Sequence, residues 1–286
     1  MKLLAMAAAL SCLATAAIAG TPYPVQIKCP VGGKSFTHIS TMSSSTWGRR
    51  PDGKPYGSWE FPMPIPECPD NRLVIFTEFS KDQIKALGPI LASPEYKALA
   101  GETTYYRALW LAKALKLPDV SASWLLLQAS WQADGDAERK ARYQREFVAA
   151  VDAEPAVAGD LGWLSTQARA VNAERELGAF DAATARILRL REQLKAPSKD
   201  TAEGQAGANE RGGLDTFLKL EEAAIARKDV SAEPIDLVSP RIGAQKCIAM
   251  EDAGEAVSDL CKTTAMADMI KRERGIRQSL ATPPKS

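Results

Sequence analysis

The sequence predicts a mainly α-helical fold, in which helical hairpins follow a small module of short strands and loops. Residues 20–80 contain nine of the eighteen prolines and many glycines, so this part of the chain cannot form long helices. From about Ser80 to Leu194, Ala, Leu, Arg, Glu and Gln dominate, and apolar residues recur at helical spacing. Glycine-containing turns interrupt this pattern, as they do where two helices form a hairpin.

The N-terminal module, residues 20–80, is expected to contain short strands joined by tight turns. Gly32-Gly33 and Pro51-Asp52-Gly53 are typical turn sequences. The run from Leu73 to Thr77 is rich in β-forming residues and predicts a short strand.

The helical domain, residues 81–195, is divided by capping residues, prolines and glycines. Ser93-Pro94 is typical of a helix start, and Thr103 or Thr104 can cap a helix that Pro118 ends. The next helices are expected to carry Trp124 to Trp131, to run from Asp136 to before Pro155, from Leu161 to Leu177, and from Asp181 to Leu194.

The last third of the chain predicts a C-terminal helical extension, residues 214–286. Residues 196–213 have the composition of a flexible linker. A helix is expected over 214–227, an irregular stretch over 229–243 because of its prolines, and a final helix over about 251–278.

The strongest internal pattern is a repeated helix–turn–helix unit. Trp124, Leu127 and Trp131 are followed by Gly135, a spacing similar to the first helix and turn of a tetratricopeptide hairpin. Gly178, Phe180 and Ala183 repeat the turn glycine, the aromatic residue and the small residue of such a unit. Glycine allows a left-handed helix end, and alanine allows close helix packing. An ordinary helical bundle with aromatic core positions is the alternative interpretation.

The first 19 residues are typical of a cleavable secretory signal peptide. Lys2 precedes an apolar run from Leu3 to Leu13, and Ala17-Ile18-Ala19 fits the cleavage rule for small residues. We therefore expect a periplasmic or secreted protein. A lipoprotein anchored through Cys12 is a less favoured alternative, because the sequence before Cys12 fits a lipobox only loosely.

The charge balance and hydropathy argue against two classes of partner. The chain has 36 basic and 35 acidic residues, whereas a nucleic-acid-binding protein normally has a basic excess or stripe. No segment after the signal peptide is apolar enough to predict a membrane span.

Four cysteines remain after the signal peptide: Cys29, Cys68, Cys247 and Cys261. An even number in an oxidising compartment favours disulfide bonds over free thiols. Three pairings are possible, and proximity in the sequence favours Cys29 with Cys68 and Cys247 with Cys261.

Two cysteine motifs in the N-terminal module look like degraded zinc knuckles. They are Cys29-Pro30-Val31-Gly32-Gly33-Lys34-Ser35-Phe36 and Cys68-Pro69-Asp70-Asn71. A structural zinc site needs two cysteines in each half, and Gly32 and Asn71 stand at the second positions. Since His38 is the only histidine, we expect no bound zinc and no other cofactor.

This order of motifs, followed by tetratricopeptide-like helices, resembles an uncharacterised bacterial family, the domain of unknown function 2225. The resemblance covers roughly Cys29 to Leu194. Its most specific parts are Cys29 to Phe36, Cys68-Pro69, Tyr105 to Gly135, and Leu177 to Ala183. It implies an architecture without an established activity. In the family both leading cysteines hold one metal, so the resemblance implies that Cys29 and Cys68 can form a disulfide in its place.

No constellation of residues predicts catalysis. His38 lies in a Ser/Thr-rich stretch without a nucleophile motif, and no glycine-rich phosphate-binding loop is present. Glu221-Glu222 are expected on the solvent-exposed face of a helix.

Aromatic and basic residues alternate in the glycine- and proline-rich segment from Thr46 to Phe61. Trp47, Arg49, Tyr56 and Trp59 are candidates for contacts with a partner. The competing interpretation is that these aromatics cover a small N-terminal core.

The sequence as a whole favours an exported helical-repeat binding or scaffold protein with an unidentified envelope or secreted partner. The alternative is an unrecognised extracytoplasmic hydrolase or carbohydrate-acting enzyme.

Overall fold

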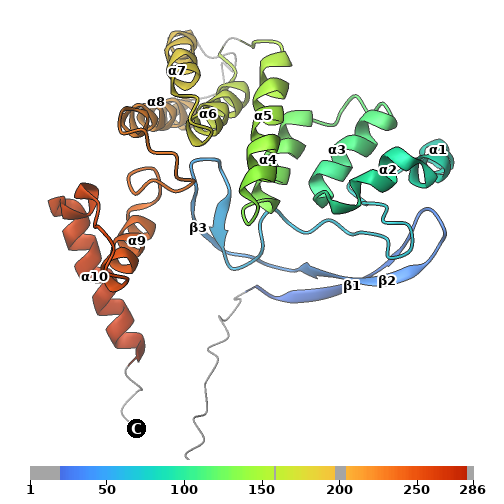
Figure 1. The fold of residues 1–286 in the computed structure, drawn as a ribbon, viewed down its shortest axis with the longest axis horizontal. Coiled ribbons are helices and arrows are strands. Elements are labelled where there is room, and N and C mark those ends of the chain that lie inside the picture. The colour runs from blue at the N-terminus through green and yellow to red at the C-terminus, as the bar shows by residue number, and fades with distance from the viewer. Residues whose placement is uncertain (1–19, 158, 197–203, 282–286) are drawn as a thin grey trace, which may run out of the picture.

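The computed structural model describes residues 20–157, 159–196 and 204–281, and it confirms the mainly helical fold class. Two small β-hairpins precede ten α-helices (Figure 1). The expected signal peptide, Cys12 and part of the expected linker lie outside the described residues. Within these ranges, no helix combines the length and the hydropathy that crossing a membrane requires.

The strands form two separate antiparallel pairs, β1 with β2 and β3 with β4. Their bounds are β1 Pro22–Lys28, β2 Ser35–Thr41, β3 Thr46–Arg49 and β4 Pro55–Gly57. The helices are α1 Lys81–Ala92, α2 Pro94–Ala98, α3 Thr104–Ala114, α4 Ala122–Gln132, α5 Ala137–Ala153, α6 Leu161–Glu176, α7 Phe180–Leu194, α8 Gly204–Ala226, α9 Pro240–Asp252 and α10 Thr264–Ala281.

Side-chain caps fix the starts of most of the first helices. Ser80 and Gln83 form a capping box at α1, and Thr103, not Thr104, caps α3. Asp136 and Asp160 accept hydrogen bonds from backbone N–H groups in the first turns of α5 and α6. The helix starts in residues 81–195 therefore lie close to the positions that the sequence predicts.

Helices α4 and α5 form one antiparallel hairpin, and α6 and α7 form the next. Gly178, with φ of 73°, ends α6 in a left-handed turn, in which Ala179 N–H bonds to the carbonyl of Glu174 at 2.8 Å. Ala183 is fully buried between the helices, as expected. The prediction for Gly135 is wrong: its φ is not positive, because α4 already ends at Gln132.

The hydrophobic core does not divide at the boundary between the N-terminal module and the helices. Cys29, Cys68 and Leu73 belong to the same buried cluster as residues of α1 to α6. A second cluster lies between α6, α7 and α8, and a third joins α9 to α10. Residues 20–80 thus differ from the helices in secondary structure but share their core.

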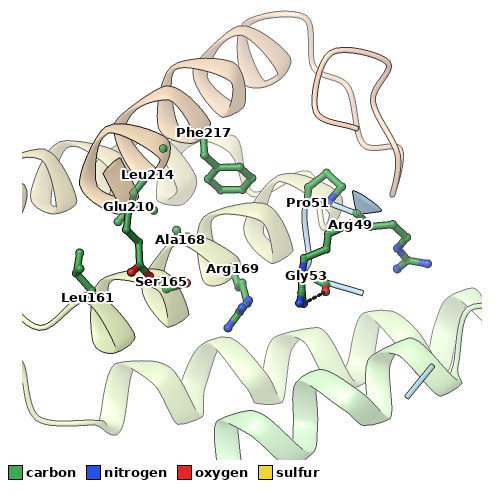
Figure 2. Close-up of a pocket in the computed structure, with 12 residues that line it drawn as sticks. Arg49, Pro51, Gly53, Leu161, Ser165, Ala168, Arg169, Glu210, Leu214 and Phe217 are labelled. Carbon is green, nitrogen blue, oxygen red and sulfur yellow. Dashed lines mark hydrogen bonds between the residues drawn. The ribbon is translucent and has the colours of Figure 1, made fainter. Parts of the chain in front are cut away.

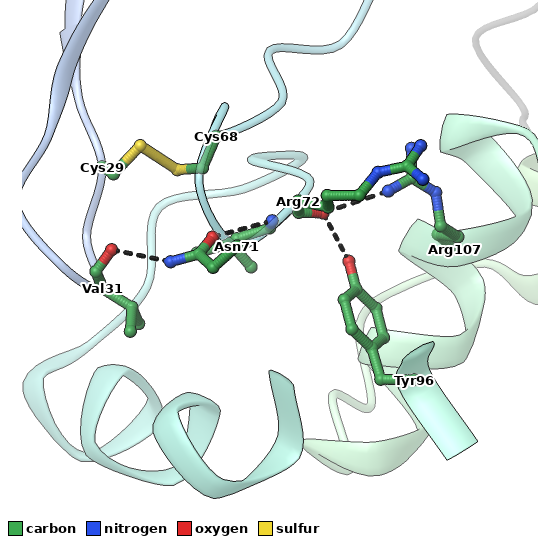
Figure 3. Close-up of a disulfide and its surroundings, with 8 residues drawn as sticks. Cys29, Val31, Cys68, Asn71, Arg72, Tyr96 and Arg107 are labelled. Carbon is green, nitrogen blue, oxygen red and sulfur yellow. Dashed lines mark hydrogen bonds between the residues drawn. A yellow bond between two sulfur atoms is a disulfide. The ribbon is translucent and has the colours of Figure 1, made fainter. Parts of the chain in front are cut away.

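Two turns that share one backbone hydrogen bond bring Cys29 and Cys68 together in a disulfide bond (Figure 3). Each cysteine N–H bonds at 2.9 Å to the carbonyl five residues later, that of Lys34 or of Leu73. Gly33 and Arg72, four residues after the cysteines, both have positive φ. Asn71 closes the pair of turns by donating to the carbonyl of Val31 at 2.9 Å.

Gly32 differs from a metal ligand in its backbone conformation as well as in its residue type. Its φ is 85°, a conformation that a cysteine rarely adopts. Among the described residues, no group of three or more His, Cys, Asp and Glu side chains is arranged to hold a metal ion.

Three expected elements differ in the structure. In place of the expected strand from Leu73 to Thr77, there is a single β-bridge between Val74 and Glu67. No strand among the described residues lies beside this segment to extend the pairing. Helix α8 begins at Gly204, ten residues before Leu214, so residues 204–213 are helical and not part of a flexible linker. The packing of residues such as Phe217 on α6 and α7 offsets the low helix propensity of the glycines.

The C-terminal helices also lie elsewhere than expected. Residues 240–252 form α9, because Ser239 and Pro240 start a helix within the stretch expected to be irregular. Gly254, with φ of 68°, then ends that helix where a continuous one was expected. Cys247 and Cys261 form the second disulfide between α9 and the turn before α10.

Glu221 is buried, which corrects its predicted place on a solvent-exposed face. Its carboxylate accepts a hydrogen bond from Nε of Arg175 at 2.8 Å, and both side chains are inaccessible to solvent. Burial raises the pKa of Glu221 to about 7, although the charge of Arg175 opposes this shift. Glu222 faces outward and forms a half-exposed pair with Arg191.

We expect Glu221→Ala to lower the free energy of unfolding by about 3–5 kcal/mol, because Arg175 would keep its buried charge without a carboxylate. The matched control is Glu222→Ala, which should cost about 0–1 kcal/mol because its ion pair is partly solvated. Urea denaturation at pH 7 measures both. Equal losses in the two variants would contradict the assignment of Glu221 to the interior.

The two disulfides should contribute unequally to stability, because they close loops of different length. The cysteines are 39 residues apart in the first bond and 14 in the second. On the chain-entropy model, replacing the first pair by alanine should cost about 4 kcal/mol and the second about 3 kcal/mol. Urea denaturation of the two double variants tests this order, and a larger loss for Cys247→Ala/Cys261→Ala would contradict it.

Candidate functional site

The structure separates the four residues that the sequence offers as partner contacts. Trp47 is 49% exposed on β3, and Arg49 is exposed at the end of the same strand. Tyr56 and Trp59 are half-buried, and their hydroxyl and indole N–H lie inside the protein. The four side chains therefore do not form one exposed aromatic surface.

Tyr56 and Trp59 pack inward against different parts of the chain. Burial raises the pKa of the Tyr56 hydroxyl, and the nearby carboxylate of Glu233 raises it further. Trp59 lies against Gly20, where an added Cβ would be 2.7 Å from the indole ring. Trp59 therefore packs within the N-terminal module, whereas Tyr56 lies beside Glu233 of the C-terminal part.

The β3–β4 hairpin is held against the helices by an ion cluster at its tip, residues 50–54. Buried Arg50 pairs with Asp52 inside the tip and with Asp134 in the α4–α5 turn at 2.6 Å. Lys54 donates to the same Asp134 carboxylate at 2.7 Å and to the carbonyl of Trp131 at 3.2 Å. These contacts fix the tip on α4 and on the turn that follows it.

The same tip also touches α6. Gly53 has φ of 89°, and an added Cβ there would lie 2.8 Å from Nε of Arg169. The hairpin therefore covers the sides of α4 and α6 that face it, and we call these sides the hairpin face. Helices α4 and α6 are the first helices of their two hairpins, so the hairpin face includes one helix from each.

A hollow of about 260 Å³ lies where the tip, α6 and α8 meet (Figure 2). Leu161, Ala168, Leu214 and Phe217 form its apolar wall. Arg49 and Arg169 lie on the side of the tip, and the Glu210 carboxylate lies at the other end, beside Ser165 (Figure 2). The hollow thus has a cationic side and an apolar side.

Arg50 also lines the hollow but is paired with Asp52 and Asp134, whereas Arg49 and Arg169 form no ion pair within the described residues. Arg49 donates only to the carbonyl of Gly53 at 3.3 Å. Arg169 lies over the ring of Trp124, with 5.9 Å between the guanidinium carbon and the ring centre. The nearby carboxylate of Asp52 is bound by Arg50.

The charge of Arg169 is therefore poorly compensated. Burial lowers its pKa, and the positive charge of Arg49 lowers it further, while Asp52 opposes the shift. The interior arginines Arg50, Arg107, Arg175 and Arg186 all have carboxylate partners. The sequence contained no signal for this difference, because Arg169 looks like any other basic residue on a helix.

A groove of about 590 Å³ has apolar walls with polar residues such as Asp119 and Gln128 among them, and its Trp124 lies under the Arg169 guanidinium of the hollow. Its walls include Met63, Ile65 and Phe76 from the N-terminal module and Tyr105, Trp124 and Leu125 from α3 and α4. Trp124 remains 46% exposed beside it. An extended chain lying in the groove would pass Trp124 before it reached the hollow.

Asp134 joins the hairpin tip to the helices, and the titration of its carboxylate makes this contact sensitive to acid. Burial alone would raise its pKa, but hydrogen bonds from Arg50 and Lys54 outweigh it and hold the pKa at about 2. Because this value is below that of the unfolded chain, the stability that Asp134 contributes is complete above about pH 4 and is lost as the pH falls through 2.

We therefore expect Asp134→Asn to lower the free energy of unfolding at pH 7 by about 1–2 kcal/mol, after allowing for solvent screening. Between pH 5 and pH 2 the variant should lose less stability than the wild-type protein. Urea denaturation across this range measures both quantities. Parallel pH profiles of the two proteins would contradict the role of Asp134.

Comparisons of the chain with protein-family models, curated proteins and solved structures found no match. The resemblance to the domain of unknown function 2225 therefore stays a prediction, and the interpretation of the site depends on its own geometry.

Proposed function

We propose that this chain is an exported binding or scaffold protein that holds an extended segment of a partner protein along the hairpin face. The observation that carries the proposal is Arg169, an uncompensated charge placed between the groove and the hollow. A partner would supply the carboxylate that the chain itself does not.

The compartment follows from the cysteines. Both pairs form disulfides, which indicate an oxidising, extracytoplasmic location. The periplasm, or secretion beyond it, is the finer assignment that we propose together with the signal peptide. Both cysteine turns share one backbone hydrogen bond and a positive φ four residues after the cysteine, which supports the resemblance to the domain of unknown function 2225, and we retain that resemblance as a proposal.

The shape and charge of the site favour one kind of occupant. Apolar and aromatic side chains of the groove, including Phe76 and Tyr105, suit apolar residues of an extended segment, and polar ones such as Gln128 can bond to its backbone. Arg49 and Arg169 at its end require negative charge. We therefore propose that the partner segment is apolar where it lies in the groove and acidic where it reaches the arginines.

Photocrosslinking in the cells that export the protein tests this proposal. A crosslinking residue at Trp124, which lies in the groove, should yield a discrete adduct with one protein. The matched control is the same residue at Leu188, which is 59% exposed on α7. We expect the Trp124 adduct to disappear when Arg169 is changed to Met, because the partner would lose its charged contact.

The partner must then bind through an acidic stretch. Neutralising that stretch in the captured protein should weaken its binding to the purified chain by about tenfold or more. Adducts of equal yield from Trp124 and Leu188, or an adduct that persists after Arg169→Met, would reject the hairpin face as the binding site.

A further inference from the structure

The hollow has two chemically different sides that lie within the reach of one small group. Arg49 and Arg169 both line the hollow, on the side of the hairpin tip (Figure 2). Leu214 and Phe217 of α8 lie across from them (Figure 2). A group that filled this space would need negative charge at one side and an apolar body at the other.

We propose that the hollow binds an apolar group that carries a carboxylate, supplied by the C-terminal residue of the partner segment. This inference rests on the proposed function and names the part of the partner that the site recognises. The terminal carboxylate lies between Arg49 and Arg169, and the apolar side chain of the same residue packs against Leu214 and Phe217.

The size of the hollow favours a single side chain with its carboxylate. Sites for drug-sized ligands occupy about 300–1,000 Å³, and the hollow is smaller, at about 260 Å³. The groove is larger, at about 590 Å³, and accepts the residues that precede the terminus.

The charged side chains around the hollow favour a ligand group with one negative charge, such as a carboxylate, over a more highly charged group. Each guanidinium has N–H donors left for a ligand, since Arg49 uses one for the Gly53 carbonyl and Arg169 donates no hydrogen bond within the described residues. Glu210 adds a negative charge at the opposite end of the hollow (Figure 2). One negative charge on the ligand is attracted by the arginines, whereas a second one would face repulsion from Glu210.

The desolvated state of Arg169 gives the carboxylate a preorganised partner. Its guanidinium is held by the Trp124 ring on α4 and by the close approach of Gly53. A charge-assisted hydrogen bond made here is stronger than one in water, because the surroundings screen it less. Binding should weaken as the salt concentration rises, since Arg49 is exposed to solvent.

Isothermal titration calorimetry of the full mature chain tests the proposal with four probes. Two are small molecules, 3-phenylpropionate and its neutral amide. The other two are short apolar peptides that end in phenylalanine, one with a free C-terminal carboxylate and one with a C-terminal amide. We expect both acids to bind, the free peptide more tightly, and both amides to bind at least about tenfold more weakly.

The variants Arg169→Met and Arg49→Met should each weaken binding of the two acids by about tenfold or more, since each removes one charged donor. The matched control is Arg189→Met, which removes an exposed arginine from α7 and should leave binding unchanged. Arg49→Met removes one hydrogen bond of 3.3 Å, to the Gly53 carbonyl, and no ion pair, so it keeps the test decisive if Arg169→Met fails to fold.

Equal binding of acids and amides, or binding that survives both variants, would overturn the proposal. Binding of 3-phenylpropionate without any gain from the peptide would keep the carboxylate site but reject a chain terminus as its source. If the acids bind as expected while the Trp124 adduct is absent in cells, the hollow is confirmed and the proposed partner function fails.

Discussion

The arrangement of this protein depends on one interaction, the insertion of Arg50 between Asp52 of its own turn and Asp134 of the α4–α5 turn. It fixes a short β-hairpin, which could not be stable alone, onto two helical hairpins. Once the tip is fixed, Gly53 is pressed against α6, and the chain that follows is led beneath α3 and α4 (Figure 1). The hollow exists because the hairpin tip lies on that face without filling the space between α6 and α8.

The interior of the helical part is unusual in its charged content. Arg175 with Glu221 and Arg186 with Glu174 are buried pairs that join neighbouring helices. Such pairs contribute little net stability compared with apolar contacts, but each allows only one alignment of the helices that carry it. Because these buried arginines are paired with carboxylates, Arg169, which has no carboxylate partner among the described residues, is a candidate binding residue.

Local signals in the sequence were sufficient for the elements that are determined locally. The caps at Thr103 and Asp136, the left-handed turn at Gly178 and the pairing of neighbouring cysteines all follow from residues within a few positions or from proximity. Features that depend on contacts between distant segments were missed. The early start of α8, the burial of Glu221 and the charge imbalance at Arg169 each depend on how α6 meets α8 or the hairpin tip. Hydrophobic periodicity describes the faces of one helix at a time, so it does not predict which elements pack against each other.

The order of the cysteines has a consequence for how the chain matures during export. Each disulfide joins cysteines that are consecutive within residues 20–281, Cys29 to Cys68 and Cys247 to Cys261. A chain that emerges from a translocation channel N-terminus first therefore exposes each correct thiol partner before any wrong one. An oxidase that simply joins thiols in their order of appearance produces the native pairing, and no isomerase is needed to correct it. The N-terminal turns can be sealed while the helices that will cover them are still on the other side of the membrane.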